Sequence, residues 1–175
     1  MKAKLVLTIM NIISWIIFIG LCIKAGTLII TTSISLFVNQ EAARDLYLGL
    51  NLFNLYKYDN WYYIAVMSLI ITIAVLKAYM FYFVIKIFLK FDLKKPFTSN
   101  SADLISKISY VALGIGVISK ISNDYYKWLT THRVETHISL DFGSEDMLFM
   151  AGILFIVAYI FKYGVKIQSE NELTI

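Results

Sequence analysis

Four long, mostly apolar stretches constrain this chain more than any other feature of its sequence. They cover about residues 5–30, 62–89, 104–128 and 147–165, and the third is the most polar. A helix that crosses a lipid bilayer needs about 20 mostly apolar residues. Only 16% of the residues are charged, whereas an ordinary soluble domain carries roughly 25%. We therefore predict a single all-α membrane domain, a bundle of four transmembrane helices.

The Lys and Arg residues outside the apolar stretches predict how the helices are oriented. Basic residues are enriched in short cytoplasmic loops. Nine of them would lie near the two termini and the loop at about 90–103: Lys2, Lys4, Lys86, Lys90, Lys94, Lys95, Lys107, Lys162 and Lys166. Four would lie near the opposite loops, at about 31–61 and 129–146: Arg44, Lys57, Lys127 and Arg133. We therefore expect a multi-pass protein of the cell (cytoplasmic) membrane with both termini, including a tail at about 166–175, in the cytoplasm.

Two aromatic clusters agree with this orientation. Trp61, Tyr62 and Tyr63 begin the second apolar stretch, and Tyr125, Tyr126 and Trp128 end the third. Tyr and Trp side chains favour the membrane–water interface. Both clusters are therefore expected at the outer interface.

The two outer loops alternate apolar residues with others, a pattern typical of half-buried strands. The first loop contains Leu46, Leu48, Leu50 and Leu52 in alternation, and the second contains Val134, Thr136, Ile138, Leu140 and Phe142. Because a lone strand leaves its backbone groups unpaired, we predict a small extracellular two-stranded β ribbon formed by both loops. An amphipathic helix lying on the membrane is the alternative for the first loop.

The predicted cytoplasmic segments have their own local signals. Pro96 cannot continue a helix, so a turn is expected there. Asn100 and Asp103 resemble a capping pair that begins the third span. The tail from Gln168 to Ile175 is short and polar, and we expect it to be mobile.

Two segments resemble a known family. One is the turn Lys95–Asn100 (KPFTSN), and the other is the ending that begins Phe161–Gly164 (FKYG) and closes with Asn171–Thr174 (NELT). Together they resemble the DUF2975 family of bacterial membrane proteins, although Asn171 and Glu172 stand where the family usually has an acidic pair, with Asp before the Leu. The resemblance implies a four-span membrane protein of uncharacterised activity, which is often encoded beside a small helix-turn-helix regulator.

The sequence offers no set of residues typical of an active site, so we predict no enzyme, cofactor or metal. Cys22 lies alone in an apolar stretch, and on a strand His132 and His137 would point to opposite sides. Gly114 and Gly116 lie within a span with no strand before them, which favours close helix packing over a phosphate loop. The carboxylates lie outside the spans or near their ends, which argues against a proton-coupled exporter.

Three lysines within the apolar stretches, Lys24, Lys77 and Lys120, are the candidate intramembrane site. An ionisable side chain at membrane depth is a functional candidate by default. Lys77 has apolar neighbours. Lys120 belongs to a polar stripe that we expect to face the bundle interior, formed by Ser106, Ser109, Gly116, Lys120, Asn123 and Lys127. The lysines either are satisfied by interfacial water, tyrosine hydroxyls and carbonyls, or bind an anionic group or a partner.

We consider three functions. The first is a regulatory or sensory membrane protein that engages a cytoplasmic partner, such as a small helix-turn-helix regulator, without contacting nucleic acid itself. Its candidate contact residues are Pro96, Phe97, Asn100, Gln168, Glu172, Leu173 and Thr174. The second is a channel or transporter for an anionic solute, assembled as a homo-oligomer. The third is a membrane immunity or scaffold protein.

Overall fold

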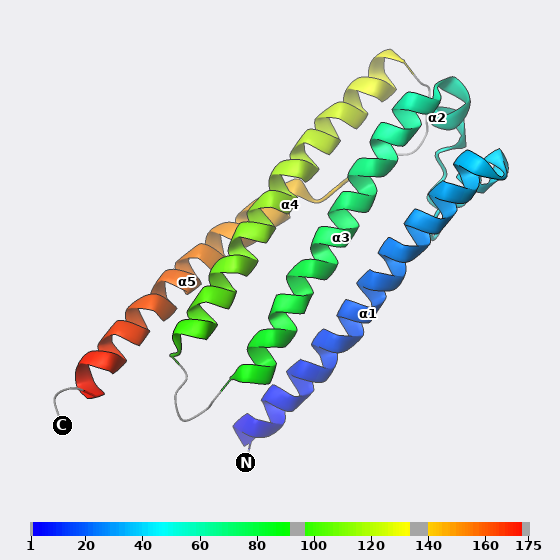
Figure 1. Cartoon of the computed structure of the whole chain (residues 1–175). Helices are drawn as coiled ribbons and strands as arrows, with labels where there is room; N and C mark the ends of the chain where they lie inside the picture. The colour runs from blue at the N-terminus through cyan, green and yellow to red at the C-terminus, as the bar shows by residue number, and fades with distance from the viewer. Residues whose placement is uncertain (1, 92–96, 134–139, 173–175) are drawn as a thin grey trace.

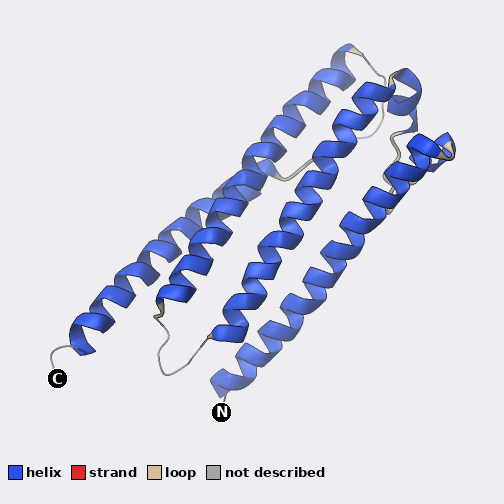
Figure 2. Cartoon of the chain, in the orientation of Figure 1, coloured by secondary structure: helices blue, strands red, loops and turns tan. Residues whose placement is uncertain are grey.

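The computed structural model describes residues 2–91, 97–133 and 140–172, and within these ranges the secondary structure is helical with no β-strand (Figure 2). The long helices are α1 (Lys2–Phe37), α3 (Asn60–Lys90), α4 (Ser99–His132) and α5 (Ser144–Glu172). Two short helices, η1 (Gln40–Arg44) and α2 (Phe53–Tyr58), lie between α1 and α3. All four long helices are long and apolar enough to cross a membrane, which confirms the predicted all-α chain with four candidate spans.

The four long helices form an open row. α1 packs against α3, α3 against α4, and α4 against α5 (Figure 1). Within the described residues, no other two of these helices bring Cα atoms within 8 Å of each other, so the predicted four-helix bundle is an open row there. Lipid tails are as apolar as leucine, so no hydrophobic force draws helices together inside a bilayer. The edge helices accordingly leave large side chains uncovered, such as Ile16 and Phe149, which are 65% and 73% exposed.

α4 lies inside the row and packs on both sides through small residues. Its buried positions include Ser101, Ala102, Ser109, Ala112, Gly116, Ser119 and Ser122. Small side chains allow two helix backbones to approach closely. A Cβ atom at Gly116 would lie only 2.7 Å from Cδ2 of Leu148 in α5, whereas one at Gly114 would have nothing within 4 Å. The predicted close-packing site therefore exists at Gly116 and not at Gly114.

The first outer loop does not form the predicted strand. Leu46 N–H donates to the Leu50 carbonyl (2.9 Å), and Leu50 N–H donates to the Tyr47 carbonyl (3.0 Å). The backbone has positive φ angles at Leu48 (47°) and Gly49 (82°), which a strand cannot accommodate. The prediction was wrong because the leucines pack locally: Leu46 and Leu52 are buried against α1 and α3, whereas Leu48 is 88% exposed.

The β ribbon is therefore unsupported. Its first strand is replaced by a turn, and most of its second strand, at residues 134–139, lies outside the described residues. The alternative of one amphipathic helix for the first loop also differs from the structure, because the loop contains two short helices, η1 and α2, joined by this turn.

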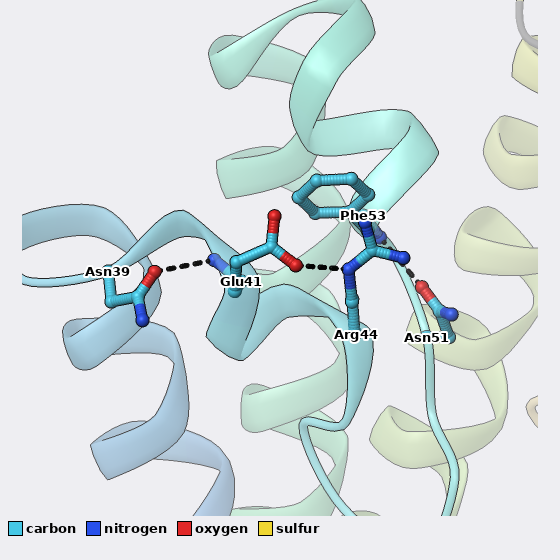
Figure 3. A network of polar contacts seen from close by, with 5 residues as sticks. All are labelled: Asn39, Glu41, Arg44, Asn51 and Phe53. Atoms are coloured by element: carbon cyan, nitrogen blue, oxygen red, sulfur yellow. Dashed lines mark hydrogen bonds and ion pairs between the residues drawn. The ribbon is translucent and has the colours of Figure 1, made fainter.

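Polar contacts join the two short helices of this loop (Figure 3). The Asn39 side chain accepts from Glu41 N–H (3.0 Å), and Glu41 pairs with Arg44. The Arg44 guanidinium lies 4.0 Å from the ring centre of Phe53, and Asn51 accepts from Phe53 N–H (3.0 Å). An exposed ion pair adds little stability. Of these contacts, the one between Arg44 and Phe53 runs from η1 to α2, and the others are local to one helix.

The N-cap of α4 lies two residues before the predicted one, Asn100. Thr98 is its N-cap, and the Thr98 hydroxyl accepts from Ser101 N–H at 3.1 Å. The same hydroxyl donates to Oγ of Ser101 (2.8 Å). Threonine is a favoured N-cap because its oxygen satisfies a free N–H of the first turn. The predicted cap at Asn100 and Asp103 is therefore wrong, since both residues are exposed within the helix.

Candidate functional site

The start of α5 lies beside Asn123, more than two turns before the end of α4. Asn123 of α4 donates to the Ser144 hydroxyl (3.2 Å) and accepts from Phe142 N–H (3.0 Å). Asn123 lies nine residues before the end of α4 at His132, which is about 14 Å along a helix. The non-helical segment 140–143 therefore enters between the long helices, and we call it the re-entrant segment. Irregular backbone at membrane depth is tolerated where protein covers it or where it lines a cavity.

A pocket of about 370 Å³ lies at this re-entrant segment. It is bounded by α1, α3, the first outer loop and the segment 140–143. The lining residues are Leu21, Lys24, Leu28, Tyr47, Leu50, Ile70, Ile73, Ala74, Lys77, Leu140, Asp141, Phe142 and Gly143. The structure thus brings together two of the three predicted lysines, from different helices.

The two pocket lysines are held differently. Lys24 is exposed, and its ammonium lies 5.7 Å from the ring centre of Tyr47. Lys77 is half-buried among the apolar residues of α3. In the part of the chain that the structure describes, neither lysine has a carboxylate oxygen within 4.0 Å. Asp141 also lines the pocket, but one of its carboxylate oxygens accepts from Gly143 N–H (2.8 Å).

Lys120 does not belong to this pocket. It is exposed on α4 and pairs with Asp124 one turn later (3.3 Å), with 59% of its side chain uncovered. The expectation that its polar stripe faces the interior is wrong for this residue. Ser119 and Ser122 lie on the buried face instead, because α4 turns its small residues toward its neighbours in the row.

The predicted cytoplasmic contact residues fall into three groups. Asn100 is exposed and Gln168 is half-buried. Phe97 packs against α5, with its ring centre 5.3 Å from that of Phe161. The remaining candidates cannot be placed: Pro96, Leu173 and Thr174 lie outside the described residues, and the side chain of Glu172 is not described.

Phe97 fits a notch in α5. A Cβ atom at Gly164 would lie 2.5 Å from Cδ1 of Phe97, closer than real Cβ contacts allow. Phe97 directly precedes Thr98, the N-cap of α4, so this contact joins the start of α4 to α5. We refer to Phe97, Phe161 and Gly164 as the Phe97 clamp.

α5 continues through most of the predicted mobile tail. It remains helical to Glu172. Lys166 pairs with Glu170 across one turn (3.9 Å), and the Ser169 hydroxyl donates to the Lys166 carbonyl (2.7 Å). A pair spaced by four residues stabilises a helix, so residues 168–172 extend α5, and the mobility of the tail stays a prediction.

Residues 51–175 match the family model described as "Protein of unknown function (DUF2975)". The chain belongs to the DUF2975 family. The match runs from just before α2 to the last residue and confirms the resemblance seen in the KPFTSN and FKYG segments. No curated protein and no solved structure matches the chain.

In this DUF2975 member, the two segments that carried the resemblance touch each other through the Phe97 clamp. Lys77 lies within the residues matched to DUF2975, whereas Lys24 and the rest of α1 precede them. Among the described residues, no three His, Cys, Asp or Glu side chains gather at one point as a metal site would need. His137 lies outside the described residues.

Sequence reasoning missed two residues of the pocket, Tyr47, whose ring lies under the Lys24 ammonium, and Asp141, which lines the wall. It named Asn123 only as a member of the polar stripe, and the structure shows that Asn123 holds the segment 140–143. The one available signal was the Asp141–Gly143 sequence directly before an apolar stretch, because Asp and Gly favour turns. Nothing local indicated that this turn lies beside the middle of α3.

Proposed function

We propose that the protein is a regulatory or sensory membrane protein whose cytoplasmic end binds a soluble protein, such as a small helix-turn-helix regulator. The Phe97 clamp is the observation that carries this proposal. It joins the residue before the N-cap of α4 to the last turns of α5, so that two chain segments can present a single surface. The excess of basic residues on this side of the helices supports a cytoplasmic location.

The surface beside the clamp has the composition of a protein contact. Tyr163 and Ile167 are 58% and 42% exposed near the end of α5. Lys162 and Lys166 are exposed on the same turns. Tyrosine is enriched in interfaces, and lysines at the edge of a contact favour an acidic partner surface. A rigid helix end also loses less conformational entropy on binding than a mobile tail would.

A photo-crosslinking amino acid at position 167 tests the proposal in cells, with position 149 on the apolar face of α5 as the matched control. Position 167 is expected to yield an adduct with a soluble regulator, and position 149 is not. The Phe97→Ala variant should reduce the adduct about tenfold, because it releases the turn from α5.

Other adducts would overturn this function and indicate which alternative holds. If position 167 captures only a second copy of the chain, a homo-oligomeric channel or transporter is favoured. If it captures only a different membrane protein, an immunity or scaffold role is favoured. An adduct with a soluble regulator that persists unchanged in Phe97→Ala would show that the clamp does not form the contact surface.

A further inference from the structure

The pocket between α1, α3 and the segment 140–143 brings two cations together at membrane depth. Lys77 lies 17 residues after the start of α3 and 13 before its end, which is about 25 Å and 20 Å along the helix. Placing a charged side chain near the middle of a bilayer is costly unless it is paired or hydrated. Lys24 lines the same pocket from α1, so two like charges share one space, which is electrostatically unfavourable.

The charges that line the pocket do not cancel. Lys24 and Lys77 contribute two positive charges, and Asp141 contributes one negative charge that is partly engaged by Gly143 N–H. Within the described residues, neither ammonium forms an ion pair. An anionic group between the two lysines would remove their repulsion and supply the missing hydrogen-bond acceptors.

Apart from Tyr47 and these charged residues, the side chains that line the pocket are mainly apolar. The walls include Leu21, Leu28, Ile70, Ile73, Ala74 and Phe142. A small hydrated anion would leave these side chains facing its water, whereas an acyl chain would cover them. The volume of about 370 Å³ lies within the range of pockets that hold small molecules, roughly 300–1,000 Å³.

We propose that this pocket binds an anionic amphiphile, with its phosphate or carboxylate between Lys24 and Lys77 and its apolar chain against α1 and α3. The re-entrant segment 140–143 forms one wall of the pocket. Irregular backbone is tolerated at membrane depth where it lines a cavity in this way. Asn123 positions that wall through its bonds to Phe142 and Ser144. This site is independent of the cytoplasmic partner proposed above.

Native mass spectrometry of the full chain from nanodiscs tests the proposal. The discs contain phosphatidylcholine with a minor fraction of phosphatidylglycerol, and retained lipid is counted. The wild-type chain is expected to retain phosphatidylglycerol selectively, and the double variant Lys24→Met/Lys77→Met to retain about tenfold less. Lys120→Met is the matched control, because Lys120 is also in a long helix but lies outside the pocket.

Two further arms separate the sources of the anion and guard against misfolding. Inorganic phosphate is added to discs of mixed lipid; if it displaces phosphatidylglycerol completely, the ligand is a free anion and the amphiphile is excluded. Leu21→Trp keeps both lysines but fills the apolar wall, and it should also lower lipid retention. Unchanged retention in the double variant, or in Leu21→Trp, would overturn the proposal.

Discussion

The ring of Phe97 occupies the space that any side chain at Gly164 would need. A Cβ atom at position 164 would lie 2.5 Å from Cδ1 and 2.8 Å from Cγ of that ring. Residues 67 positions apart in the sequence are thus fitted to each other at the end of α5. The glycine is required by close approach and not by backbone conformation, since it lies within a helix.

Gly164→Leu should separate the turn from α5. The added side chain has to displace Phe97, and overpacking of this kind costs about 1–3 kcal/mol of unfolding free energy. Unfolding in mixed detergent micelles measures the loss. Gly152→Leu is the control on the same helix, because nothing lies within 4 Å of its Cβ position, and it should be neutral or stabilising.

The double variant Gly164→Leu/Phe97→Ala distinguishes a local clash from a general effect of leucine. Removing the ring makes room for the leucine, so the double variant should recover part of the stability. If the double variant is no more stable than Gly164→Leu alone, the leucine does not clash with Phe97.

Gly116→Leu should be at least as damaging as Gly164→Leu. A Cβ atom there would meet the Leu148 side chain at 2.7 Å and its backbone nitrogen at 3.0 Å. A backbone atom cannot rotate away, so α4 and α5 must move apart, at a cost of about 1–3 kcal/mol or more. Gly114→Leu, two residues away with open space, is the control. Equal losses at both positions would contradict the packing described.

Asn123→Ala should loosen the re-entrant segment. It removes the acceptor of Phe142 N–H and a donor to Ser144. An unsatisfied buried group costs about 1–3 kcal/mol. Hydrogen exchange at residues 140–143, followed by mass spectrometry, should become faster. Asn100→Ala, on the exposed face of the same helix, should leave exchange in this segment unchanged.

Tyr63→Phe should weaken the contact between the end of α1 and the start of α3. The Tyr63 hydroxyl lies 2.6 Å from that of Ser35, and both side chains are buried. Loss of this hydrogen bond is expected to cost about 0.5–1.5 kcal/mol. Detergent unfolding measures the change, with Tyr62→Phe as the control, since Tyr62 packs in the neighbouring aromatic cluster with Tyr58 and Trp128. A cycle with Ser35→Ala should show coupling between the two sites.

Local sequence patterns were sufficient to predict features that depend on residues close together in the chain. The apolar stretches predicted four helices, because each can satisfy its backbone internally and cover its side chains with lipid. The two short motifs predicted the family. The alternating leucines at 46–52 misled, because Leu46 and Leu52 are buried on either side of a turn at Leu48–Gly49, and Leu48 is exposed, so the four leucines do not share one face as they would on a strand.

The sequence by itself determined that the chain is helical, apolar and able to cross a membrane four times. Only the tertiary structure decided that the helices form an open row, that Phe97 packs at Gly164, and that Lys24 and Lys77 share a pocket while Lys120 pairs with Asp124. The physical reason is that helix formation depends on neighbours within one or two turns. Which helix faces meet depends on close packing between residues far apart in the sequence, and the helical period alone does not encode it.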